Sequence, residues 1–121
     1  MEEELIITTE EINDTILLTL TGDLTKTSGD QLLHYFHWEQ GLPNNKSIVV
    51  ISFENVNYIN SAGIAYMIRL CRVLNDKNIM IRAFGLEYHY EKMFNIVGLT
   101  RYLTHYPSQW AAVEGMESNN R

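Results

Sequence analysis

The chain has 121 residues, of which 45% are hydrophobic and 20% charged, and its formal net charge is −6. This length and composition predict one globular domain with a single core, and they exclude a wholly disordered chain. The acidic balance argues against a nucleic-acid partner, because binding a phosphate backbone needs a clustered basic face.

Nothing in the sequence predicts export or membrane insertion. The residues after Met1 are acidic, whereas a secretory signal would be basic. The longest apolar run, 48–51, has the length of a strand and is far shorter than the roughly 20 residues that span a bilayer. We therefore expect a cytoplasmic protein.

The first elements predict a hairpin. β-branched and alternating residues predict strands at 5–9 and 15–21, and Gly22 and Asp23 form the turn that closes the second strand. A helix follows, and its start is marked by a possible capping box at 27–30.

This first helix is expected to run until Gly41 and Pro43, which are typical residues just beyond a helix end. The apolar run at 47–53 then predicts a central strand that is buried on both faces. An asparagine-rich loop is expected at 54–60.

The second half of the chain alternates helices and strands. A stripe of apolar residues predicts an amphipathic helix at 61–76, with Cys71 among those that face the core. The remaining elements are a strand at 79–84, a helix at 87–97 with inward residues that include Met93 and Val97, a strand at 99–104 and a terminal helix capped by Ser108.

The resulting order, β-β-α-β-α-β-α-β-α, predicts an α/β fold. Its sheet is mixed and mostly parallel, with an N-terminal hairpin and helices packed against the sheet. We expect a single domain at 1–114 and a disordered tail at 115–121. Two aromatic side chains, Trp38 and Trp110, are expected to be exposed, where they pack on neighbouring helices or mark a second interface.

The usual catalytic motifs of nucleophilic hydrolases, zinc proteases, P-loop proteins and dinucleotide-binding proteins are missing from the sequence. His34 and His37 share a helix at i, i+3, but no acidic or cysteine partner for a metal site is evident nearby. Cys71 lies on the inward stripe and should be an inert core residue. We therefore predict no catalytic residue, no metal site and no cofactor.

The junction between the buried strand and the amphipathic helix is the most informative segment. Asn60 or Ser61 should cap the helix, and the small residues Ala62 and Gly63 leave the Ser61 hydroxyl uncovered. A phosphate on Ser61 would be compatible with the fold, because the first amides and the positive end of a helix favour an anion.

Four segments of the chain resemble the STAS family, the sulfate-transporter and anti-sigma-factor-antagonist domain, and the resemblance covers about Leu5 to Val113. The segments are Gly22-Asp23-Leu24, Ile48-Val49-Val50-Ile51, Val56-Asn57-Tyr58-Ile59-Asn60-Ser61-Ala62-Gly63 and Phe94-Asn95-Ile96-Val97-Gly98-Leu99.

The resemblance implies an anti-sigma factor antagonist, because stand-alone bacterial members of this size have that role. In the family pattern, the helix opens with Asp-Ser-Ser/Thr-Gly, and its first serine is phosphorylated by a serine kinase that is also the anti-sigma factor. Ser61 falls on this serine, and Asp23 matches an acidic position close to it. A phosphatase would reverse the modification.

Two positions depart from the pattern, since Asn60 replaces the usual Asp and Ala62 replaces the second Ser or Thr. The alternative is a non-phosphorylated STAS subunit of a larger assembly, either a stressosome-type scaffold or a lipid-transport accessory. A hydrolase that uses Ser61 lacks an acid and base partner.

The predicted contact surface combines the segment after the second strand, the Ser61 junction and the outer face of the next helix. Its residues are Asp23, Leu24, Thr25, Asn60, Ala62, Gly63, Ala65, Tyr66 and Arg69. For Asp23 and its neighbours, a purely structural turn remains the other interpretation.

Overall fold

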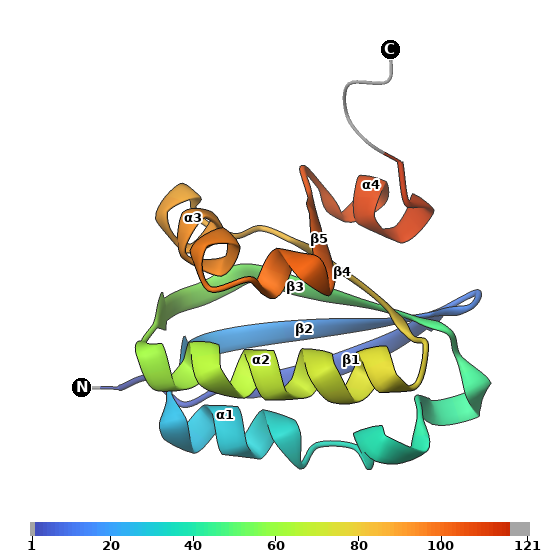
Figure 1. Ribbon diagram of the computed structural model, residues 1–121, viewed down its shortest axis with the longest axis horizontal. Coiled ribbons are helices and arrows are strands. Elements are labelled where there is room, and N and C mark those ends of the chain that lie inside the picture. Colours follow the sequence, from blue (N-terminus) through green and yellow to red (C-terminus); the bar gives the residue numbers. More distant parts are fainter. Residues whose placement is uncertain (1, 117–121) are drawn as a thin grey trace.

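Helices pack over both faces of a five-stranded sheet (Figure 1). The computed structural model describes residues 2–116. The strands are β1 (Ile6–Ile12), β2 (Thr15–Leu24), β3 (Ile48–Ile59), β4 (Met80–Phe84) and β5 (Leu103–Tyr106). The α-helices are α1 (Lys26–Leu33), α2 (Ser61–Asp76), α3 (Tyr88–Ile96) and α4 (Gln109–Glu114).

The five strands form one sheet in the order β1-β2-β3-β4-β5. β1 pairs antiparallel with β2, and the remaining pairs are parallel. The predicted α/β class, the N-terminal hairpin and the element order are therefore confirmed. None of the helices within residues 2–116 is long and apolar enough to cross a membrane.

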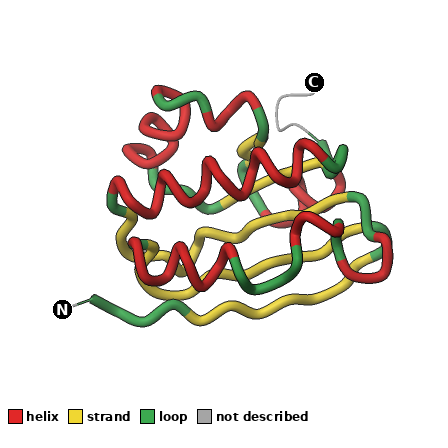
Figure 2. The backbone as a smooth tube through the Cα atoms, turned by 60° about the horizontal axis from the view of Figure 1, so that its bottom comes forward, coloured by secondary structure: helices red, strands yellow, loops and turns green. Residues whose placement is uncertain are grey.

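The two faces of the sheet are covered by different helices. α1 and α2 lie side by side on one face, in front of the strands in Figure 2. The other face packs against α4, through a smaller cluster that includes Leu17, Val50 and Phe84. Because side chains alternate along a strand, Val49 and Ile51 belong to the α1–α2 side, whereas Val50 between them faces α4.

β2 and β3 are longer than the sequence predicts. β2 continues through Gly22 and Asp23, so these residues extend a strand and do not form a turn. β3 continues to Ile59, and most of the expected loop at 54–60 is strand. The two strands pair in parallel to their ends, and this long-range pairing overrides the low strand propensity of asparagine.

α1 is shorter than expected and begins earlier. Its N-cap is Thr25, which forms a capping box with Ser28, and the helix ends at Leu33 instead of near Gly41. The chain then folds back, and the Trp38 indole Nε1 donates a hydrogen bond to the Leu32 carbonyl at 3.0 Å. Trp38 is only 2% exposed, so the prediction of an exposed Trp38 is wrong.

α2 begins and ends as predicted. Its inward stripe buries Ile64, Met67, Cys71 and Leu74, with Leu70 beside them. α3 has a narrower buried stripe of Tyr90 and Phe94, and the expected inward positions Met93 and Val97 are exposed. Trp110 is exposed as expected.

The last elements are displaced by a few residues. A 3-10 turn occupies Leu99–Arg101, so the last strand starts at Leu103. Ser108 caps α4 as predicted, since its side chain accepts a hydrogen bond from the Ala111 amide. Gly115 ends α4 in the left-handed conformation, and 117–121 of the predicted tail lie outside the described residues.

Candidate functional site

The N-terminus of α2 meets the carboxyl ends of β2 and β3. Asn60 caps the helix, because its side-chain Oδ1 accepts a hydrogen bond of 2.9 Å from the Gly63 amide. The Asn60 amide in turn donates to the Leu24 carbonyl at 3.2 Å. Ser61 is the first residue of α2 and is exposed. The cap predicted at Asn60 or Ser61 is therefore Asn60, which leaves the Ser61 hydroxyl at the surface.

Asp23 lies at the end of β2 and is buried, with 8% of its surface exposed. Its carboxylate Oδ2 accepts a hydrogen bond of 2.7 Å from the Glu3 amide, and its own amide donates to the Glu3 carbonyl at 3.1 Å. The Asp23 carbonyl accepts the Ser28 hydroxyl at 2.7 Å. Asp23 thus ties the start of the chain and the first turn of α1 to the end of β2.

Residues Glu2, Glu3 and Glu4 form an N-terminal strap across this end of the sheet. The Thr25 hydroxyl donates to the Glu2 carboxylate at 2.7 Å, and the Asn57 side chain donates to the Glu3 carboxylate. A Cβ on Gly22 would lie 2.2 Å from the Glu4 carbonyl oxygen, so the glycine allows the strap to pass. No sequence pattern predicts this strap, because three glutamates outside any periodic pattern carry no signal of where they pack.

The strap closes one side of a cavity of about 450 Å³ beside the α2 N-terminus. Two carboxylates, two hydroxyl groups and one amide line it, from Glu2, Asp23, Thr25, Tyr58 and Asn60. The site next to Ser61 is therefore strongly polar and negatively charged.

The exposed face of α2 beyond Ser61 carries Tyr66 and Arg69. Arg69 lies over the Tyr66 ring, with 5.0 Å between the guanidinium carbon and the ring centre. Tyr66 packs so closely on Gly29 of α1 that a Cβ there would be 2.7 Å from the ring. This contact fixes α2 against α1, and it holds the Tyr66 ring between them.

The nine predicted contact residues fall into three groups by exposure. Ala65 and Arg69 are exposed, as is Ser61 itself. Half-buried positions are Asn60, Ala62 and Tyr66, whereas Asp23, Leu24, Thr25 and Gly63 are buried. The buried group shapes the site from below, while the first two groups present side chains at the surface.

The remaining reactive side chains lie elsewhere. Cys71 is fully buried in α2, and this burial raises the pKa of its thiol to about 12. The His34 Nδ1 lies 3.6 Å from the Asp30 carboxylate on the exposed side of α1. Across residues 2–116, no three histidine, cysteine or acidic side chains come together in a way that would hold a metal ion.

No protein-family model matches the sequence, and no curated protein matches it. Solved structures do match the fold. An anti-sigma factor antagonist from Mycobacterium paratuberculosis has a TM-score of 0.73 at 12% identity, covering 93% of this chain and 94% of its own. A putative anti-sigma factor antagonist from Thermotoga maritima has a TM-score of 0.74 at 12% identity, covering 91% and 93%.

A third similar structure is the Bacillus cell-fate determinant SpoIIAA in its phosphorylated form. Its TM-score is 0.69 at 17% identity, over 91% of this chain and 98% of that one. At such low identities, the similarity establishes the fold alone, which this chain shares with these anti-sigma factor antagonists. What the chain does with this fold has to be argued from its own site.

Proposed function

We propose that this chain is an anti-sigma factor antagonist that binds a serine kinase of the anti-sigma factor class and is switched by phosphorylation of Ser61. It would be a binding module of the cytoplasm, with Ser61 as a substrate residue and with no catalytic group or cofactor of its own. A phosphatase would complete the cycle by removing the phosphate.

The single observation that carries this proposal is the place of the Ser61 hydroxyl. It lies exposed on the first residue of a sixteen-residue helix, next to a cap made by another side chain. A kinase can therefore modify Ser61 without removing the hydrogen bond that starts the helix. The positive end of the α2 dipole also favours the resulting anion.

Release of a partner follows from the cost of burying a phosphate. The modification adds about −1.5 to −2 charges to a surface that already holds the Glu2 and Asp23 carboxylates. A partner that covers Ser61 and Ala65 would have to desolvate that charge, while the basic group on the same helix, Arg69, lies about two turns further along α2 over the Tyr66 ring. Burying an unpaired anion is unfavourable, so the complex would dissociate.

Incubation with ATP and with serine kinases encoded beside this chain tests the proposal. Mass spectrometry should place one phosphate on Ser61 and leave Ser108, which is also exposed at a helix N-terminus, unmodified. Ser61→Ala should retain binding of the kinase, whereas Ser61→Asp should weaken it about tenfold or more, the equivalent of about 1.4 kcal/mol. Equal binding by both variants would refute the charge mechanism.

The second candidate is a non-phosphorylated subunit of a larger assembly, of the stressosome-scaffold or lipid-transport type. It is favoured by the neighbours of Ser61, since Asn60 and Ala62 stand where the phosphorylated pattern has Asp and Ser or Thr. A chain that stays unmodified with every neighbouring kinase, and that co-purifies as a large stoichiometric complex, would support this candidate over the first.

A further inference from the structure

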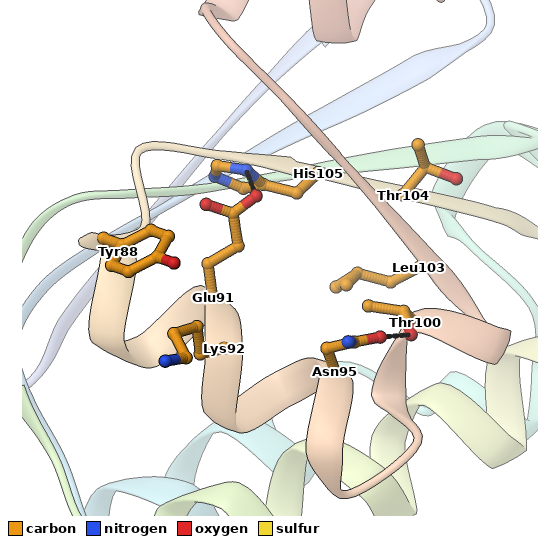
Figure 3. Close-up of a pocket in the computed structure, with 8 residues that line it drawn as sticks. All are labelled: Tyr88, Glu91, Lys92, Asn95, Thr100, Leu103, Thr104 and His105. Carbon is orange, nitrogen blue, oxygen red and sulfur yellow. Dashed lines mark hydrogen bonds and ion pairs between the residues drawn. The ribbon is translucent and has the colours of Figure 1, made fainter.

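A groove of about 440 Å³ lies between α3 and the last strand, and it shares no lining residue with the cavity beside Ser61 (Figure 3). One wall is a single face of α3, at spacings of three and four residues, and the other is the strand itself. The lining residues are Tyr88, Glu91, Lys92, Asn95, Thr100, Leu103, Thr104 and His105.

The groove follows the free edge of β5. Within the described part of the chain, β5 pairs with β4 alone and is the last strand of the sheet. Side chains of successive strand residues point to opposite faces, yet the groove touches Leu103, Thr104 and His105 in succession. A groove that meets both faces of a strand has to lie at its edge, where backbone N–H and C=O groups lack a neighbouring strand.

Glu91 is the acidic side chain of the groove, and within the described residues its contact with a titratable partner is with His105. The His105 Nε2 accepts a hydrogen bond of 3.1 Å from the Leu86 amide, so the ring proton belongs on Nδ1 and the ring is neutral. Nδ1 then faces the Glu91 carboxylate at 3.3 Å. His105 therefore orients Glu91 without neutralising it. Lys92, which also lines the groove, lies over the Tyr88 ring at 5.5 Å from its centre.

Apolar and hydrogen-bonding groups complete the groove. Leu103 is 1% exposed and forms an apolar floor. The Asn95 Oδ1 accepts the Thr100 hydroxyl at 3.0 Å, which leaves the amide nitrogen of Asn95 to donate. In Figure 3 Asn95, Thr100 and Leu103 lie toward the other end of the groove from Glu91 and His105.

We propose that this groove binds an extended peptide segment of a partner protein, which adds to β5 as a further strand and places a Lys or Arg side chain against Glu91. Strand addition uses the free backbone groups of β5 for affinity, and side-chain pockets for specificity. The choice of a basic segment rests on charge complementarity, because the Glu91 carboxylate faces a neutral imidazole and the whole chain has a net charge of −6. With four residues in β5, the paired part of the segment would be about four residues long.

Selection from a random heptapeptide phage library against the full chain tests this proposal. Bound peptides should be enriched in β-branched residues and should share one Lys or Arg position. A selected peptide should shift the backbone amide resonances of residues 103–105. Glu91→Gln should weaken its binding about tenfold, because a charge-assisted hydrogen bond becomes a neutral one.

Two variants serve as matched controls. Glu87→Gln makes the same charge change just before α3 but lies outside the groove, so it should leave peptide binding unchanged. Ser61→Ala should also have no effect, which separates this groove from the proposed phosphorylation site. A library that yields no binders, or binders equally affected by Glu87→Gln, would overturn the proposal.

A second copy of this chain is the other possible occupant. Sedimentation velocity across a range of protein concentrations distinguishes it. A dimer that Glu91→Lys dissociates would assign the groove to self-association and overturn the partner-peptide proposal, whereas a monomer at all concentrations is the expected result.

Discussion

Gly63 and the Leu24 carbonyl are in such close contact that a Cβ on Gly63 would stand 2.2 Å from the Leu24 oxygen. The same carbonyl accepts the Asn60 amide at 3.2 Å. Together these contacts join the first turn of α2 to the end of β2. They explain why Ser61 lies beside the Asp23 end of the sheet, although the two residues are 38 positions apart in the sequence.

Gly63→Ala should lower stability, although alanine is the better helix former. Helix propensity alone would raise the free energy of unfolding by about 1 kcal/mol. The clash is with backbone, which cannot rotate away, and such overpacking costs about 1–3 kcal/mol. We expect a net loss of up to about 2 kcal/mol in urea denaturation. Ala65→Gly, on the exposed face of α2, is the control, because it changes helix propensity without changing a packing contact. A Gly63→Ala protein that is more stable than wild type would show that Gly63 does not pack closely on the Leu24 carbonyl.

Asn60→Ala should cost about 1 kcal/mol of unfolding free energy, because it removes the side-chain acceptor for the Gly63 amide. Asn60→Asp should keep the cap at neutral pH, since a carboxylate accepts the same hydrogen bond and favours a helix N-terminus. Urea denaturation of both variants measures the difference. Equal losses in the two variants would show that Asn60 acts through something other than its cap.

Asp23→Ala should release the N-terminal strap. The Glu3 amide loses its carboxylate acceptor, and the reciprocal bond from residue 23 to the Glu3 carbonyl is weakened. Hydrogen exchange of the amide at position 23 should accelerate about tenfold, in line with the ~1.5 kcal/mol of a hydrogen bond to a charged group. Asp23→Asn retains an acceptor oxygen and should exchange close to the wild-type rate. Unchanged exchange in Asp23→Ala would mean that the strap is held by its other contacts.

Local signals predicted α2 and its cap well, because the polar N-cap, the small first-turn residues and the apolar stripe all agree on the same element. The ends of β2 and β3 were predicted poorly for the opposite reason. Gly22 and Asn55 favour turns locally, and only the pairing between the two strands makes them extended. That pairing joins residues far apart in the chain, such as Thr21 and Asn55, which are 34 positions apart. No local sequence pattern spans such a separation.

The site was predicted in part. The sequence placed Ser61 at the start of a helix and grouped it with Asp23, which the structure brings to the same end of the sheet. The strap depends on hydrogen bonds between residues about 20 positions apart or more, such as Glu3 to Asp23. The fold-back after α1 likewise depends on the Trp38 indole reaching the Leu32 carbonyl, which no local preference indicates.

The two tryptophans should differ sharply in fluorescence. Trp38 is buried and hydrogen-bonded, whereas Trp110 is 63% exposed. Trp110→Phe should leave a blue-shifted emission that acrylamide quenches weakly, with a stability change within about 0.5 kcal/mol. Trp38→Phe should leave a red-shifted, readily quenched emission. It should also cost about 1–3 kcal/mol, because the Leu32 carbonyl is left without its buried partner.

Cys71 should make the fold sensitive to alkaline pH. Burial raises the pKa of its thiol from 9.0 to about 12 in the folded chain. The unfolded chain therefore ionises first, near pH 9, and loses a proton that the folded chain retains. The stability contributed by the neutral thiol is complete below pH 9 and declines as pH rises from 9 toward 12.

The slope of this decline is about 1.4 kcal/mol per pH unit for one such group. Other groups also titrate in this range, so Cys71→Ala supplies the reference. This variant should be less stable at pH 8, because it leaves a small cavity in the core. Its disadvantage should shrink by about 1.4 kcal/mol per pH unit between pH 9.5 and 10.5, as measured by urea denaturation at each pH. Parallel stability curves for the two proteins would show that Cys71 ionises alike in the folded and unfolded chains, and that it lies in contact with solvent.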